Sequence, residues 1–204
     1  MDNSMRAIFV DIETTGLSPY KHRLLELALK IVDLTTGEEI ATYEAIVQQP
    51  TAVWKNSDPV SLKINGFSPQ KSAQGRTESV ISSEVEAFLE SHVIRRGEAI
   101  FIAQNSSFDR AFFAQLIDPC HQEQLQWPYH WLDLASMYWC VRSTEQSHQG
   151  LPPPDRLSLS KDEIADRYGI PPEATPHLAI NGVNHLITCY NAVLAGQIPG
   201  SEEA

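Results

Sequence analysis

Three stretches near the start of the chain carry the pattern of β-strands. Residues 5–12 form an almost continuous apolar run, which is typical of a strand buried on both faces of a sheet. Residues 24–32 and 39–47 are two further strand-like runs, joined by a short segment with a turn at Gly37. Residues 24–28 fit a helix equally well by propensity. The turn spacing favours a meander of three antiparallel strands.

The rest of the chain alternates helical and strand-like patterns. Residues 49–76 contain three prolines and form a connector with one short helix at 58–64. Apolar spacing and end signals then predict helices at 77–96, 105–117, 134–142, 159–168 and 178–195, strands at 99–103 and 131–133, and a mobile loop at 143–155. This order of elements indicates an α/β layered fold with a mixed sheet.

The composition fits one globular domain, because 42% of the 204 residues are hydrophobic and can form a full core. We expect this domain to span residues 1–204, with a core at about 5–196 and a short tail at 197–204. The sequence contains no apolar run long enough to span a membrane and no signal peptide, which predicts a soluble, cytoplasmic protein.

The net charge of −11 argues against extensive binding along duplex DNA, which depends on lysine and arginine contacts to phosphate. The charge is compatible with metal-mediated binding of the end of a nucleic-acid strand. The three cysteines, Cys120, Cys140 and Cys189, are widely spaced, so we expect buried free thiols rather than a disulfide or a zinc site.

The chemistry is concentrated at the end of the first strand. Asp11 and Glu13 stand two residues apart, so in a strand both side chains project from the same face. Two adjacent carboxylates on one face of a sheet repel each other, and a bound cation would stabilise them. The simpler alternative is an ordinary strand whose polar face lies in solvent. Asp109 opens the helix after the fourth strand, and all three carboxylates can therefore converge at one edge of the sheet.

The segment Phe-Val-Asp-Ile-Glu-Thr-Thr-Gly-Leu at 9–17 resembles the first motif of the DEDDh exonuclease superfamily, which includes polymerase proofreading subunits, RNase T and oligoribonuclease. The segment Gln-Asn-Ser-Ser-Phe-Asp at 104–109 resembles the second motif, in which histidine usually stands at the position of Gln104. The third motif, H-x-x-x-x-D, begins at His177, but Gly182 stands where the family has its fourth acid. The resemblance spans residues 5–196. It implies an RNase H-like fold, with three antiparallel strands followed by two parallel strands.

The resemblance also implies a reaction. Such enzymes use two Mg²⁺ or Mn²⁺ ions to hold the scissile phosphate. Carried over to this chain, Asp11, Glu13 and Asp109 hold the ions, and His177 takes a proton from the attacking water, a task suited to imidazole. The missing acid at 182 weakens the ion that Glu13 helps to hold, because hard cations prefer carboxylate oxygens. Asn181 and His185 are candidate neutral replacements.

The implied substrate is the 3′ end of single-stranded DNA or RNA. Backbone amides at 14–17 would hold the terminal sugar and phosphate, and two apolar side chains would pack on the base. The candidate substrate-binding residues are Thr14, Thr15, Gly16, Leu17, Asn105 and Phe108. Asn105 also stands where it can cap the following helix. A homodimer is compatible with the acidic surface.

Two interpretations of the site remain open at the level of sequence. The first is a 3′-to-5′ exonuclease with one weakened ion, which the presence of His177 favours. The second is an inactive exonuclease-like module that binds nucleic acid or protein, which Gly182 favours. A third, in which the carboxylates are plain surface charges, requires three correctly spaced motif matches to be accidental.

Overall fold

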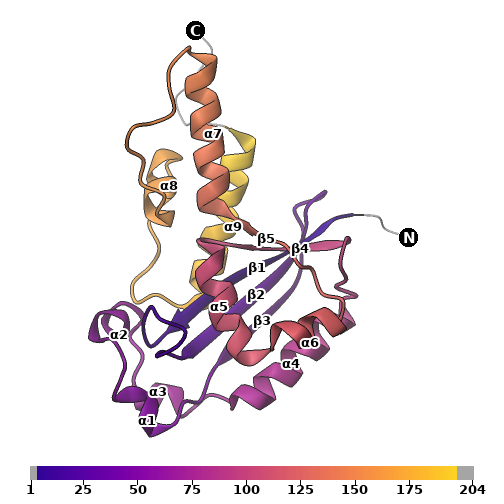
Figure 1. Ribbon diagram of the computed structural model, residues 1–204, viewed down its shortest axis with the longest axis vertical. Helices are drawn as coiled ribbons and strands as arrows, with labels where there is room; N and C mark the ends of the chain where they lie inside the picture. Colours follow the sequence, from indigo (N-terminus) through magenta and orange to yellow (C-terminus); the bar gives the residue numbers. More distant parts are fainter. Residues whose placement is uncertain (1–3, 197–204) are drawn as a thin grey trace.

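The computed structural model describes residues 4–196, in which five strands form one mixed sheet in the order β3-β2-β1-β4-β5 (Figure 1). β1, β2 and β3 are antiparallel neighbours, whereas β4 and β5 run parallel to β1. This confirms the predicted order of three antiparallel and two parallel strands. The predicted tail at 197–204 lies outside the described residues. The strands are β1 (Arg6–Thr14), β2 (Leu24–Asp33), β3 (Glu39–Ile46), β4 (Ala99–Ala103) and β5 (Trp131–Asp133).

Helices cover both faces of the sheet. α4 (Glu78–Ser91) and α5 (Ser106–Leu116) pack on one face, and their apolar side chains join those of Ile8, Val10 and Ile12 in one core. On the opposite face, α7 (Leu134–His148), α8 (Lys161–Arg167) and α9 (Ala179–Ala195) join Ala7 and Phe9 in a second core. These three helices gather at one end of the molecule (Figure 1).

The alternation of side chains along β1 decides where the two acids point. Ala7 and Phe9 pack toward α9, and side chains two residues apart share a face of a strand. Asp11 and Glu13 therefore lie on the α9 side of the sheet. The pairing of β1 with β4 ends at Phe9 and Ile102, so both acids lie beyond it, at the carboxyl end of β1. In open α/β sheets, ligands bind at this end of the strands.

Two helices end at different places from those predicted. The helix predicted at 77–96 stops at Ser91 because Val93 adopts a left-handed backbone with φ of 54°, and this turn brings Ile94 into the core. Val93 itself is exposed. α7 continues to His148, so residues 143–148 are helical rather than a loop. Glu145 in this extension forms an ion pair of 3.0 Å with Arg167 of α8, a tertiary contact that local sequence does not reveal.

The connector at 49–76 contains three short helices instead of one. Asp58 caps the predicted one, α2 (Pro59–Asn65), by accepting a hydrogen bond from the backbone N–H of Val60. The other two, α1 (Thr51–Trp54) and α3 (Pro69–Ser72), were not predicted, and a third unpredicted short helix is α6 (Pro119–Gln124).

Two further expectations can be compared with the described residues. The three cysteines are free, but only Cys189 is buried; Cys120 and Cys140 are exposed, and the expectation of burial was wrong for them. None of the helices in residues 4–196 has the length and apolar character needed to cross a membrane.

Candidate active site

A cavity of about 330 Å³ lies at the carboxyl end of β1, between α2, α5, α8 and the segment that precedes α9. It brings together residues that are far apart in the sequence, including both predicted acids of β1 and the predicted histidine. The predicted site residues that line it are Asp11, Glu13, Thr14, Leu17, Phe108, Asp109 and His177. The convergence expected from the sequence motifs is therefore present in the folded chain.

Three predicted substrate-binding residues do not line the cavity and instead shape the loops around it. The Thr15 hydroxyl accepts a hydrogen bond from the backbone N–H of Arg23 at 2.9 Å. Gly16 has a φ of 152°, and a Cβ built there would lie 2.5 Å from the ring of His22. Asn105 occupies the N-cap position of α5, but its side chain accepts from the Ser107 hydroxyl and does not cap a backbone N–H.

Of the three predicted acids, Asp109 is buried in this cavity and Asp11 and Glu13 are partly buried. Burial raises the pKa of Asp11 to about 6, against the opposing charge of Lys161. Burial, followed by the charge of Asp11, raises the pKa of Glu13 to about 8. Asp109 is 4% exposed, and burial together with the charge of Asp11 raises its pKa well above the usual range. Crowded, desolvated carboxylates of this kind favour a bound cation.

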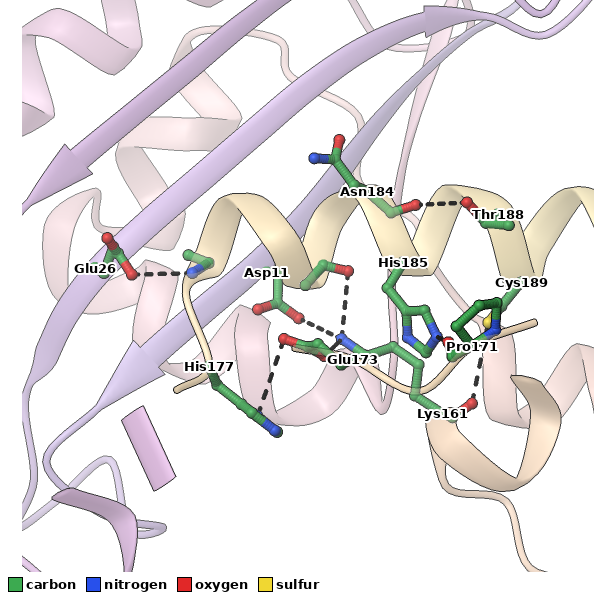
Figure 2. Close-up of polar contacts among 12 residues, drawn as sticks. Asp11, Glu26, Lys161, Pro171, Glu173, His177, Asn184, His185, Thr188 and Cys189 are labelled. Carbon is green, nitrogen blue, oxygen red and sulfur yellow. Dashed lines mark hydrogen bonds and ion pairs between the residues drawn. The ribbon is translucent and has the colours of Figure 1, made fainter. Parts of the chain in front are cut away.

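A lysine that the sequence analysis did not consider lies among these acids. The Lys161 ammonium lies 2.7 Å from Oε2 of Glu173 and 3.3 Å from Oδ1 of Asp11, and it donates to the carbonyl oxygen of Gly182 at 3.3 Å (Figure 2). Burial alone would lower the pKa of Lys161, but the charges of Asp11 and Glu173 raise it above the usual value. The ammonium therefore stays charged among the carboxylates.

Glu173 is the second residue that sequence reasoning missed, and it brings a further carboxylate to the cavity. Its side chain is 3% exposed, and its Oε1 atom is buried without a hydrogen-bond partner, 4.0 Å from Nδ1 of His177. Glu13, Glu173 and His177 each offer a ligand atom, and these atoms lie within 4.8 Å of one another. A signal was present in the sequence, since Glu173 is the only acid within ten residues of the motif histidine.

The glycine at position 182 faces the β1 carboxylate directly. Gly182 is buried in α9, and a Cβ built on it would lie 2.2 Å from Oδ2 of Asp11. This is shorter than real Cβ contacts. The missing side chain leaves the space in which the Asp11 carboxylate lies.

The neutral replacements suggested for the missing acid, Asn181 and His185, do not line the cavity. Nε2 of His185 donates to the carbonyl oxygen of Pro171 at 2.9 Å, which ties this ring to the loop before α9 (Figure 2). The sequence-based suggestion of His185 as a ligand was therefore wrong. Gln104, at the position of the usual motif histidine, lines the cavity and donates to the carbonyl oxygen of Leu159 at 2.6 Å.

Comparison with known proteins gives consistent results. The sequence profile of the exonuclease family RNase T matches residues 8–187. The oligoribonuclease of Thiobacillus denitrificans is 27% identical over 171 residues, which covers 81% of this chain and 89% of the relative. Exonuclease DPD1 of Arabidopsis thaliana, a chloroplastic and mitochondrial protein, is 25% identical over 180 residues, which covers 88% of this chain and 53% of the relative.

Solved structures of exonucleases share the fold. Escherichia coli exonuclease I in complex with a dT13 oligonucleotide superposes with a TM-score of 0.68 at 17% identity, covering 95% of this chain and 41% of that chain. A 3′-exonuclease described in 3′-end recognition of a histone mRNA stem-loop also gives a TM-score of 0.68, at 12% identity, covering 95% of this chain and 65% of that chain. The predicted RNase H-like exonuclease fold is confirmed. The chain spans less than half the length of exonuclease I and about half that of DPD1.

Proposed function

The chain belongs to the RNase T family of exonucleases, and from this membership we propose that it is a metal-dependent 3′-to-5′ exonuclease acting on single-stranded DNA or RNA. The observation that carries the proposal is the convergence of Asp11, Glu13 and Asp109 with His177 around one cavity. One strand, one helix and a loop, distant in sequence, supply these groups. Packing alone gives no reason to bury three acids together.

The residues present fit a hard divalent cation. Asp11, Glu13, Asp109 and Glu173 offer carboxylate oxygens, which Mg²⁺ and Mn²⁺ prefer, and Oε1 of Glu173 is buried without a partner. A divalent ion held there would supply a Lewis acid for the phosphate and would lower the pKa of a bound water. Glu173 takes the role of fourth acid that the sequence analysis found missing at position 182.

His177 is the proposed proton acceptor. Its side chain is 35% exposed at the cavity, and its backbone N–H donates to the carbonyl oxygen of Ile64 at 3.1 Å, which fixes the loop that carries it. This position allows the ring to face both the carboxylates and a substrate entering from solvent. The proton of an attacking water would pass to a ring nitrogen of His177 and from there to solvent.

Apolar side chains at the cavity suit a terminal base. Leu17 is 73% exposed, although it lines the cavity, and Phe108 is half-buried beside Phe112, with 4.8 Å between the ring centroids. Apolar contacts accept any base, which agrees with a substrate chosen by its free end. Among the relatives, one is named an oligoribonuclease and another binds an oligodeoxynucleotide, so the proposal covers both RNA and DNA. The expected cytoplasmic location and homodimer remain predictions.

An inactive nucleic-acid-binding module is the second candidate. The observation that favours it is the ion pair between Lys161 and Asp11, because this lysine pairs with a carboxylate oxygen that would bind metal in the family pattern. A cavity closed to metal in this way would still hold a strand end without cleaving it.

Degradation of labelled oligonucleotides separates the two candidates. Single-stranded DNA and RNA carrying a 5′ label are incubated with Mg²⁺, Mn²⁺ or a chelator. The exonuclease gives a ladder shortened from the 3′ end, which disappears with chelator and in Asp11→Asn. Asp166→Asn, an equivalent change at an exposed position, keeps the ladder, and a circular single strand stays intact. Intact linear substrate under all conditions would establish the inactive module instead.

A further inference from the structure

The Lys161 ammonium is surrounded by oxygens in the way that a bound cation is. Oxygens of Asp11, Glu173 and Gly182 lie within 3.3 Å of it, and the side chain is only 13% exposed. These three oxygens come from β1, the loop before α9 and α9 itself. Of the described residues that line the cavity, Lys161 is the only lysine or arginine.

The fold fixes where this ammonium lies. Lys161 is the first residue of α8, and the Ser160 side chain caps that helix by accepting from the backbone N–H of Glu163. Ile164 and Ala165 of α8 are fully buried in the same core as α9. The side chain is therefore anchored at its base by packing, unlike a lysine on a mobile surface loop.

The position of the ammonium coincides with the departure from the family pattern. Gly182, where the fourth acid is missing, contributes its carbonyl oxygen to Lys161. A Cβ at position 182 would collide with the same Asp11 carboxylate that pairs with Lys161. The loss of the acid and the presence of the lysine are thus two parts of one local arrangement.

We propose that Lys161 replaces one of the two divalent ions, so that this cavity binds a single divalent cation beside a built-in ammonium. The Lys161 ammonium forms ion pairs with Oδ1 of Asp11 and Oε2 of Glu173. The remaining carboxylate oxygens of these two residues, with those of Glu13 and Asp109 in the same cavity, are the proposed donors for one ion. A second divalent ion on the same carboxylates would meet a positive charge that is already paired there.

The proposal rests on the proposed function only in treating the cavity as a site for divalent metal. Its test counts bound ions and does not depend on turnover. An active exonuclease that binds two ions would contradict the single-ion site and leave the function standing. A protein that binds one ion and leaves all oligonucleotides intact would support the single-ion site and contradict the proposed exonuclease function.

Titration with Mn²⁺, followed by electron paramagnetic resonance of the free ion and by calorimetry, gives the number of ions per chain. We expect one ion in the wild type and two in Lys161→Met, which removes the ammonium but keeps an unbranched side chain. Lys63→Met makes the same change in net charge at an exposed position near the cavity and should bind one ion. Lys161→Arg keeps the positive charge and should also bind one.

The wild-type count is decisive without any variant, because two ions or none per chain would overturn the proposal. A single ion in a folded Lys161→Met protein would overturn it as well. Lys161→Gln serves as a second neutral variant if the methionine protein fails to fold, and circular dichroism with thermal unfolding checks each variant before titration.

Discussion

Replacing Gly182 by alanine places a methyl group against the carboxylate of Asp11. The built Cβ lies 2.2 Å from Oδ2, 2.5 Å from Cγ and 2.8 Å from Oδ1, whereas ordinary contacts begin at 3.4 Å. Oδ2 must therefore move by about 1.2 Å, and its movement strains the pairing of Oδ1 with Lys161 at 3.3 Å. One added carbon thus displaces a proposed metal ligand without changing the charge of the site.

Two opposing terms determine the stability of Gly182→Ala. Alanine in a helix interior is more favourable than glycine by about 0.5 to 1 kcal/mol. Inserting a methyl into filled space costs about 1 to 3 kcal/mol. We therefore expect the free energy of unfolding to fall by up to about 2.5 kcal/mol. We also expect the affinity for Mn²⁺ to fall by about 10- to 100-fold, because the geometry of one ligand is lost.

Chemical unfolding and Mn²⁺ titration measure these two effects, and two comparisons isolate the cause. Asn184→Ala lies at an exposed position of the same helix, where only helix propensity changes, so it should raise stability by less than about 0.7 kcal/mol. In an Asp11→Ala background the obstructing carboxylate is absent, and Gly182→Ala should then stabilise the protein. An equal change in stability on Gly182→Ala in the wild-type and Asp11→Ala backgrounds would refute the proposed collision with the Asp11 carboxylate.

Further predictions concern pH, the fourth acid and the substrate. The raised pKa values of Glu13 and Asp109 mean that the folded, metal-free chain binds more protons than the unfolded chain between about pH 5 and pH 8. Its stability should therefore fall as pH rises through this range. Thermal unfolding in the presence of chelator measures this, and a stability that increases with pH would contradict it. Added Mn²⁺ should stabilise more at pH 8 than at pH 5, because protons no longer compete for the carboxylates. Glu173→Gln should weaken Mn²⁺ binding by about tenfold or more, measured by calorimetry, whereas unchanged affinity would remove Glu173 from the donor set. Phe108→Ala should raise KM for an oligonucleotide by about 5- to 150-fold with a smaller change in kcat; a loss of stability alone would show a purely structural role.

The sequence was sufficient to predict the sheet and the convergence of its motif residues at one cavity. The apolar run of β1 and the turn at Gly37 specify local structure, because they constrain residues that are neighbours in the chain. The spacing of Asp11 and Glu13 fixes their common face for the same reason. The prediction failed where long-range contacts determine the secondary structure. Residues 143–148 are an example, because their helix is held to α8 by the ion pair of Glu145 with Arg167.

Lys161 and Glu173 were missed for a related reason. Lys161 opens a short helix and Glu173 stands in a loop, and neither belongs to a periodic pattern or to a family motif; the one mark of Glu173 is its nearness in sequence to His177. Both residues gain their role only when α8 and the loop before α9 pack against β1. A glycine inside a helix suits a position that another group approaches closely. Only the folded structure shows that the approaching group is the carboxylate of Asp11.

The site joins two parts of the molecule that should open at different rates. β1 is hydrogen-bonded between β2 and β4 at the centre of the sheet, so its amides belong to the part of the protein that exchanges hydrogen most slowly. Glu173 and His177 stand in the segment between α8 and α9, outside the sheet, so we expect its amides to exchange faster than those of β1, through local opening that leaves the sheet folded. Asp11 and Glu13 would then keep their places while the other half of the cavity moves away. Release of a product or an ion can therefore follow local opening of this loop and needs no global unfolding.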